Sequence, residues 1–188
     1  MTRLNIILLF CAVLIGAGLT LWLDGAILSS PPVLESPKIP SEKISGEKFP
    51  DFTFTDLQGK KHDSQDYVGK IIILNFWATW CAPCIIEFPK LIKLAKDNPD
   101  IILIALSSDI NDDKIHQFLK KNPVELKNFI VARDHKRKIT TDIFKTYKLP
   151  ETIIVSPSGM ITKKILGDIE WNGEDIKLML DNLRTEKP

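Results

Sequence analysis

Cysteine and histidine are scarce in this chain of 188 residues, which contains three of each. A structural zinc site usually needs four ligands, often from a second C-x-x-C pair or from two histidines at close spacing. The histidines here stand alone at His62, His116 and His135. We therefore expect no metal or other cofactor, and we interpret each histidine as a surface residue.

An excess of charge of one sign is also missing, because 25 basic residues face 24 acidic ones and the formal net charge is +1. Domains that bind nucleic acid usually carry a strong basic excess, so we expect no nucleic-acid partner. A short basic run, Lys136–Lys138, lies between Asp134 and Asp142 and is interpreted as a solvated helix end. The 44% apolar and 26% charged residues are typical of one ordinary globular core.

The first 28 residues differ from the rest and are predicted to be a membrane anchor. Between Leu4 and Leu23 no residue carries a carboxylate, amine or guanidinium group. As a helix, this run would span the roughly 30 Å hydrocarbon core of a bilayer. A cleaved signal peptide is the alternative, since Gly16–Gly18 resembles a cleavage site. The apolar run continues past it through Trp22, which favours a retained anchor.

The flanking charges predict how this anchor is oriented. Arg3 and the amino terminus are positive and Asp24 is the first charge on the far side, so we expect the amino terminus in the cytoplasm and the remaining chain outside. Residues 29–46 contain four prolines and no hydrophobic periodicity, which predicts a semi-rigid spacer. Residues 47–188 are then the folded domain, which we expect to be monomeric.

Apolar runs of strand length alternate with amphipathic helix patterns in this domain. The runs 71–77 and 101–106 are nearly continuous, as expected for central strands buried on both faces. Similar patterns predict a helix with Ile85, Phe88, Ile92 and Ala95 on one face, a helix capped by Asn111, a strand at 129–131, a helix near 139–144, a hairpin of strands 152–155 and 161–166, and a last helix opened by Asn172. This order indicates an α/β sandwich with a mixed central sheet.

Two of the cysteines lie where the first of these strands turns into a helix. Cys81 stands at the predicted helix amino terminus, where unpaired N–H groups and the helix dipole stabilise a thiolate. Cys84 follows one helical turn later, near enough to close a disulfide and more shielded, as suits a resolving thiol. A purely structural disulfide is the alternative, but closing so short a loop removes little chain entropy.

The motif around these cysteines resembles a known family. The segment Phe76–Cys84 (FWATWCAPC), the following Glu87–Pro89 and the later Leu149–Thr152 are similar to membrane-anchored thioredoxin-fold proteins of the TlpA/ResA type. The resemblance covers about residues 47–185 and includes the segment Gly167–Trp171. It implies a thioredoxin-like three-layer sandwich, in which a mixed central sheet is flanked by helices and preceded by a transmembrane anchor.

The resemblance also implies roles for four residues. Cys81 would attack a target disulfide, Cys84 would resolve the mixed disulfide, and Pro150 would be a cis proline facing them. Glu87 would be an acid near the active site that handles protons, although a surface glutamate in the first helical turns is the alternative. Cytoplasmic thioredoxins instead carry a buried aspartate at the position of Asn75, which cannot titrate.

One position departs from the family pattern. Ile85 replaces a basic residue often found after the second cysteine, and this removes a charge that would lower the thiolate pKa values. The pair Ala82–Pro83 between the cysteines does not determine the reduction potential either. The sequence therefore leaves the potential open.

The function implied is that of a thiol-disulfide oxidoreductase on the outer face of a bacterial cytoplasmic membrane. Its partners would be protein thiols or disulfides, and a membrane transporter of the CcdA or DsbD kind would supply electrons. The implied substrates are cysteines of apocytochrome c or of proteins that assemble copper sites. A copper metallochaperone, a general disulfide oxidant and a non-catalytic scaffold are the alternatives.

Overall fold

The computed structural model of the chain describes residues 41–42 and 46–186. The predicted anchor, residues 1–28, lies outside this part of the chain, as does most of the predicted spacer. Among the described residues, no helix is both long enough and apolar enough to cross a membrane. The anchor and its orientation therefore stay predictions.

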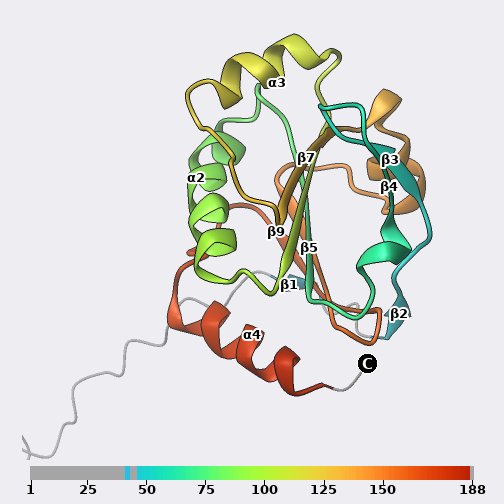
Figure 1. Cartoon of the computed structure of the whole chain (residues 1–188), viewed down its shortest axis with the longest axis vertical. Helices are drawn as coiled ribbons and strands as arrows, with labels where there is room; N and C mark the ends of the chain where they lie inside the picture. The colour runs from blue at the N-terminus through green and yellow to red at the C-terminus, as the bar shows by residue number, and fades with distance from the viewer. Residues whose placement is uncertain (1–40, 43–45, 187–188) are drawn as a thin grey trace, which may run out of the picture. The chain divides into compact units, whose positions relative to one another are not determined.

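A mixed sheet of seven strands forms the centre of the domain (Figure 1). The strand order is β1-β9-β8-β5-β6-β7, and β2 also pairs with β9. The neighbours β5, β6 and β7 are parallel, whereas β8 is antiparallel to both β5 and β9, so the predicted mixed sheet is confirmed. The strands are β1 (Ser41–Glu42), β2 (Glu47–Lys48), β5 (Ile72–Trp77), β6 (Ile102–Ser107), β7 (Phe129–Arg133), β8 (Glu151–Val155) and β9 (Met160–Leu166).

The central strands β5 and β6 are buried along their whole length, as their apolar runs predict. Successive side chains of a strand point to opposite faces of the sheet. On one face, Ile73 and Trp77 belong to a core that includes the helices α2 and α4. On the other face, Leu74 and Phe76 belong to a second core built with phenylalanines such as Phe52. The predicted three layers are therefore present.

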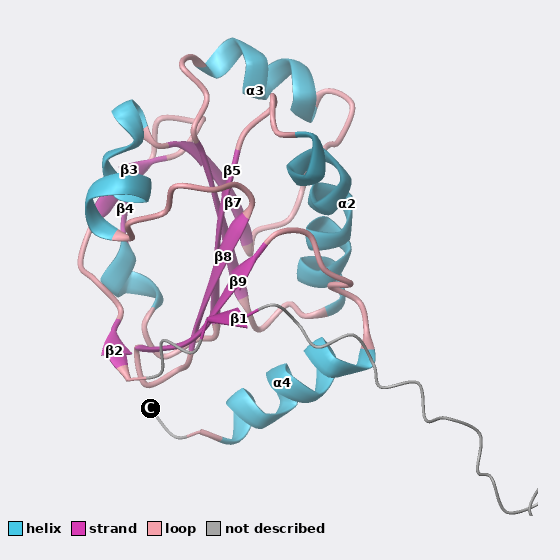
Figure 2. Cartoon of the chain, turned by 180° about the vertical axis from the view of Figure 1, so that it is seen from behind, coloured by secondary structure: helices cyan, strands magenta, loops and turns pink. Residues whose placement is uncertain are grey.

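Three α-helices pack against the first face, as the two opposite views show (Figure 2). They are α2 (Ala82–Asp97), α3 (Asp112–Leu119) and α4 (Glu174–Thr185). The Asn111 side chain accepts a hydrogen bond from the Lys114 N–H, so the predicted cap of α3 is confirmed. The prediction for the last helix was one residue early, because Gly173 rather than Asn172 is the cap of α4.

The second face is covered by short elements that the sequence patterns largely missed. They are the hairpin β3 (Thr53–Thr55) and β4 (Lys61–Asp63), the 3-10 helices η1 (Ser64–Tyr67) and η2 (His135–Arg137), and η3 (Lys138–Ile143). The predicted helix near 139–144 is η3, a π-helix rather than an α-helix. The carboxylate of Asp134 accepts hydrogen bonds from the N–H groups of Ile139 and Thr140, which fixes this segment at its start.

His62 is buried, so its interpretation as a surface residue was wrong, whereas His116 and His135 are exposed. One ring nitrogen of His62 lies 2.8 Å from Asp56 Oδ2, and the other lies 2.5 Å from the Tyr67 hydroxyl. The ring also stacks on that of Phe54, with centroids 5.0 Å apart. His62 was misjudged because its partners come from the β3–β4 hairpin and from η1, which the sequence pattern did not predict.

Candidate active site

Cys81 and Cys84 form a disulfide at the amino terminus of α2, with their Cα atoms 5.3 Å apart. Cys81 is the cap residue of this helix, and its Sγ atom accepts a hydrogen bond from the Cys84 N–H at 3.4 Å. The helix amino terminus therefore already presents a backbone donor to the sulfur of Cys81. This is the position that the sequence predicts for the two cysteines.

The turn that leads into Cys81 is tied to the end of the neighbouring strand. The Thr79 backbone N–H and hydroxyl donate to the two carboxylate oxygens of Asp109 at 2.9 and 2.7 Å. Asp109 in turn accepts a hydrogen bond from the Ser107 hydroxyl at the end of β6. These bonds hold the turn between β5 and α2, and thus the place of the first cysteine, against the sheet.

The disulfide is largely covered, but its surroundings are exposed and apolar. The exposed fraction of Cys81 is 6% and that of Cys84 is 1%, so Cys81 is the more exposed residue of the pair. Trp80 and Ile86 beside them are 64% and 61% exposed, and Ile85 is also exposed. An exposed apolar rim at a reactive disulfide is suited to contact with another protein.

Glu87 lies on α2, three residues after Cys84, and only 1% of it is exposed. The alternative of a surface glutamate was therefore wrong. The Trp171 indole N–H donates to Glu87 Oε1, and the Asn75 amide donates to Glu87 Oε2 at 3.4 Å. Asn75 also donates to the Thr152 hydroxyl at 2.9 Å. The carboxyl group is thus held between the helix, the sheet and the segment before α4.

Burial raises the pKa of Glu87 to about 7, because the charged form loses hydration. The hydrogen bond from Trp171 opposes this rise, as do the one from Asn75 and the charge of Lys90, whereas the charge of Asp168 adds to it. A carboxyl group that titrates near neutral pH can both give and accept a proton under physiological conditions. The structure thus places a buried carboxyl group with a raised pKa on the same helix as the disulfide.

Pro150 follows a cis peptide bond, as the resemblance implies. It directly precedes β8, in which Glu151 is paired with Phe76 of β5. Because β5 and β8 are antiparallel, Pro150 lies at the edge of the sheet where β5 ends and the turn to Cys81 begins. The Pro150 carbonyl accepts a hydrogen bond from the Gly167 N–H at 2.9 Å, which joins this position to the end of β9.

Three further residues belong to this site although the motif did not single them out. They are Trp171, which donates to Glu87, Lys90 on the same helix, and Asp168, which pairs with Lys90. The segment Gly167–Trp171, which contains two of these residues, forms part of the family resemblance and so could have pointed to them. A sequence motif does not show, however, which atoms its residues contact. Among the described residues, no group of three or more His, Cys, Asp or Glu side chains is arranged to hold a metal ion.

Comparison with known proteins finds thiol-disulfide oxidoreductases among the relatives of this chain. A family model described as Redoxin matches residues 44–180. The thiol-disulfide oxidoreductase ResA of a Bacillus cereus strain is 35% identical over 125 residues, which are 65% of this chain and 70% of that protein. ResA of Bacillus subtilis is 33% identical over 129 residues, which are 67% of this chain and 70% of that protein.

A solved structure shows the same fold. The thioredoxin domain of a thiol-disulfide oxidoreductase from Bacteroides vulgatus matches with a TM-score of 0.62 at 21% identity. The match covers 75% of this chain and 98% of that one. The predicted thioredoxin-like architecture is therefore confirmed for the folded domain.

Proposed function

Because this chain belongs to the Redoxin family and is a thioredoxin-like thiol-disulfide oxidoreductase of the TlpA/ResA type, we propose that it reduces disulfides of exported proteins. In this proposal the folded domain acts on the outer face of a bacterial cytoplasmic membrane, to which residues 1–28 anchor it. The apolar run Leu4–Leu23 and the positive flank at Arg3 support this placement.

The reaction is a pair of thiol-disulfide exchanges. The thiolate of Cys81 attacks one sulfur of the target disulfide, and the other target sulfur leaves as a thiolate that takes up a proton. The thiolate of Cys84 then attacks the Cys81 sulfur and releases the second target thiol. Two electrons pass to the target, and the Cys81–Cys84 disulfide is formed. A membrane donor of the CcdA or DsbD kind supplies two electrons and two protons to restore the dithiol.

The position of the two sulfurs is the observation that carries this assignment. Cys81 caps α2, where backbone N–H groups favour a thiolate, and it is the more accessible of the pair. Cys84 is covered and can be reached by Cys81 but hardly by another protein. Glu87 exchanges the proton of Cys84, and Pro150 lies beside the bound target segment.

The substrates we propose are cysteines of apocytochrome c before haem attachment, or cysteines of proteins that assemble copper sites. Both kinds of target must be reduced outside the cytoplasm, where thiols tend to be oxidised. The exposed apolar rim at Trp80 and Ile86 supports contact with an unfolded or extended protein segment. Electron supply across the membrane keeps the dithiol reduced in that compartment.

The decisive experiment traps the substrate in cells. Cys84→Ala leaves Cys81 able to attack but removes the thiol that would resolve the mixed disulfide. We expect a covalent complex that dissociates with reductant and contains a c-type cytochrome precursor or a copper-site assembly protein. Cys81→Ala is the matched control and should trap nothing. A Cys84→Ala protein that captures only unrelated exported proteins would count against the proposed substrates.

A second measurement distinguishes a reductant from a general oxidant. Rapid acid quenching and alkylation of cells reports the fraction of Cys81 and Cys84 present as thiols. A reductant fed by the membrane donor is mainly a dithiol, and it becomes a disulfide when that donor is deleted. A chain that stays a disulfide in the presence of the donor is an oxidant. Copper bound tightly by the reduced protein would instead indicate a metallochaperone.

A further inference from the structure

We propose that Trp171 is a positioning residue of the active site, whose indole N–H holds the carboxyl group of Glu87 in place. The inference rests on the proposed function, because it assigns Trp171 a role in the proton exchange of Glu87. Trp171 lies between β9 and α4, far from the C-x-x-C motif in sequence. It acts through Glu87 and touches neither sulfur nor substrate in this assignment.

The hydrogen bond between these residues is fully enclosed. Trp171 has no exposed surface, and its Nε1 atom donates to Glu87 Oε1. A buried indole N–H needs an acceptor, and a carboxylate is a strong one. Water cannot easily replace the indole at such a site. The proton affinity of Glu87 is therefore sensitive to this one donor.

The segment that carries Trp171 is fastened to α2 on both sides of the indole. Before it, the Lys90 ammonium lies 3.0 Å from both carboxylate oxygens of Asp168 and donates to the Ile169 carbonyl at 3.3 Å. After it, the Asn172 amide donates to the Lys90 carbonyl at 3.4 Å. Lys90 lies one turn after Glu87 on the same helix. The helix that carries the carboxyl group therefore also fixes the donor that faces it.

The groups around Glu87 act in opposite directions. From α2, Lys90 favours the carboxylate, and Cys84 lies one turn earlier on the same helix. From the segment before α4, Asp168 disfavours the carboxylate and Trp171 favours it, while Asn75 of β5 adds a weaker donor. Among the contributions that favour the charged form, the hydrogen bond from Trp171 is the largest.

Trp171→Phe tests the assignment because it keeps a buried aromatic ring and removes only the N–H donor. In the full-length oxidised protein in detergent, NMR follows the side-chain carboxyl carbon of Glu87 as pH is raised. We expect the titration midpoint of Glu87 to rise by about one pH unit, because the carboxylate loses one hydrogen bond and a bond of this kind is worth about that much. Trp77→Phe is the matched control, because the buried Trp77 N–H has no partner among the described residues. An unchanged midpoint in Trp171→Phe overturns the proposal.

The wild-type protein offers a test that does not depend on the variant's folding. The indole N–H resonance of Trp171 should shift with pH at the same midpoint as the Glu87 carboxyl carbon. In Glu87→Gln this pH dependence should vanish while the resonance remains. If the indole N–H resonance of Trp171 does not shift as Glu87 titrates, the proposal is contradicted, even if Trp171→Phe cannot be purified.

Activity provides the third arm of the test. The rate of reduction of a small disulfide such as oxidised glutathione is measured as a function of pH. In Trp171→Phe we expect the midpoint of this pH profile to move upward, and we expect the change to appear in kcat rather than in KM. The double variant Trp171→Phe/Glu87→Gln should match Glu87→Gln alone, because both changes act through one carboxyl group. An additive double variant refutes action through Glu87. Failure to trap the proposed protein substrates would leave these measurements unaffected, so the two proposals fail separately.

Discussion

Lys164 and Glu151 form a largely buried ion pair directly beside the cis proline, with the Lys164 ammonium 3.0 Å from Glu151 Oε1. The same oxygen accepts a hydrogen bond from the Thr146 hydroxyl, so the loop that ends in Pro150 is closed by one carboxylate. The pair joins β8 to β9, while Thr146 belongs to the segment after η3. Glu151 therefore connects the sheet to the loop that holds the proline.

Removing the cation of this pair should destabilise the fold strongly. Lys164→Met leaves the Glu151 carboxylate buried without its cation, and we expect the free energy of unfolding at pH 7 to fall by about 3 kcal/mol. The double variant Lys164→Met/Glu151→Met should recover much of this loss, because a hydrophobic pair carries no desolvation penalty. Urea denaturation measures all forms. Lys163→Met on the same strand is the control. If Lys163→Met lowers the free energy of unfolding as much as Lys164→Met does, the role of the ion pair is contradicted.

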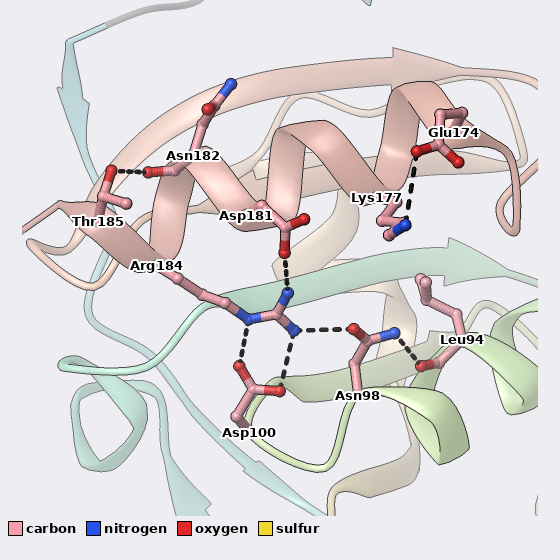
Figure 3. Close-up of polar contacts among 9 residues, drawn as sticks. All are labelled: Leu94, Asn98, Asp100, Glu174, Lys177, Asp181, Asn182, Arg184 and Thr185. Carbon is pink, nitrogen blue, oxygen red and sulfur yellow. Dashed lines mark hydrogen bonds and ion pairs between the residues drawn. The ribbon is translucent and has the colours of Figure 1, made fainter.

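A second ion-pair cluster ties α4 to the turn after α2 (Figure 3). Arg184 donates to both carboxylate oxygens of Asp100 at 2.7 and 3.0 Å, to Asp181 at 2.7 Å and to Asn98 at 2.8 Å. The hydrogen bonds from Arg184 hold the pKa of Asp100 below its ordinary value. Asp100 thus binds its proton less readily in the folded protein than in the unfolded one.

This lowered pKa predicts a pH-dependent stabilisation from Arg184. It is present above the unfolded pKa of Asp100, near 4, and is lost as pH falls through the lower folded value. Both side chains are partly exposed, so we expect Arg184→Gln to cost no more than about 1 kcal/mol at pH 7. Urea denaturation at pH 7 and pH 3 should show the difference shrinking at pH 3. Lys177→Gln on the exposed side of α4 is the control and should leave the free energy of unfolding unchanged at both pH values. If Arg184→Gln loses the same free energy at pH 7 and pH 3, the link to Asp100 is excluded.

The two thiols of the reduced protein should react at different rates. We expect alkylation to modify Cys81 first, with a thiol pKa below the ordinary value of about 8.5, because Cys81 caps α2 and is the more exposed of the two cysteines. Mass spectrometry of singly alkylated protein across pH identifies the reacting residue. Cys84→Ala should retain this fast reaction and Cys81→Ala should lose it. Faster modification of Cys84 would reverse the roles assigned to the two cysteines.

The local parts of the site could be predicted from the sequence because their signals are local. The run 71–77 has the continuous apolar pattern of a central strand, and the two cysteines follow at the start of a helical pattern. The cis bond before Pro150 came from the family resemblance rather than from periodicity. These features depend on neighbouring residues or on a motif that stays recognisable in the chain.

The partners of the buried charged groups could not be predicted in this way. Trp171 meets Glu87 only after β9 has returned along the sheet, and no periodicity links residues 84 positions apart. Lys164 likewise reads as an exposed charge until Glu151 is placed beside it on the neighbouring strand. The π-helix η3 depends on Asp134, whose carboxylate binds N–H groups five and six residues later. Each case rests on a pairing that the sequence pattern does not express.

Glu87 should make the oxidised protein less stable as pH rises. Its pKa of about 7 in the folded state lies above its ordinary value of 4.5, so the folded protein holds the proton more tightly than the unfolded one. This contribution is complete below about pH 4.5 and is lost as pH rises through about 7, which amounts to about 3 kcal/mol. Glu87→Gln cannot ionise and should remove this dependence. Urea denaturation between pH 4 and 8 measures it.

The same substitution separates stability from catalysis. Above pH 7, we expect Glu87→Gln to be more stable than the wild-type protein, because no charge is buried, and yet slower in reducing a protein disulfide, because Cys84 loses its proton partner. The amide also removes a nearby negative charge, so the pKa of at least one cysteine should fall. Asp113→Asn, an exposed carboxylate at the start of α3, is the control and should change neither property. Equal rates and equal cysteine pKa values in the wild type and Glu87→Gln would leave Glu87 as a buried structural acid and limit the proposed site to Cys81, Cys84 and Pro150.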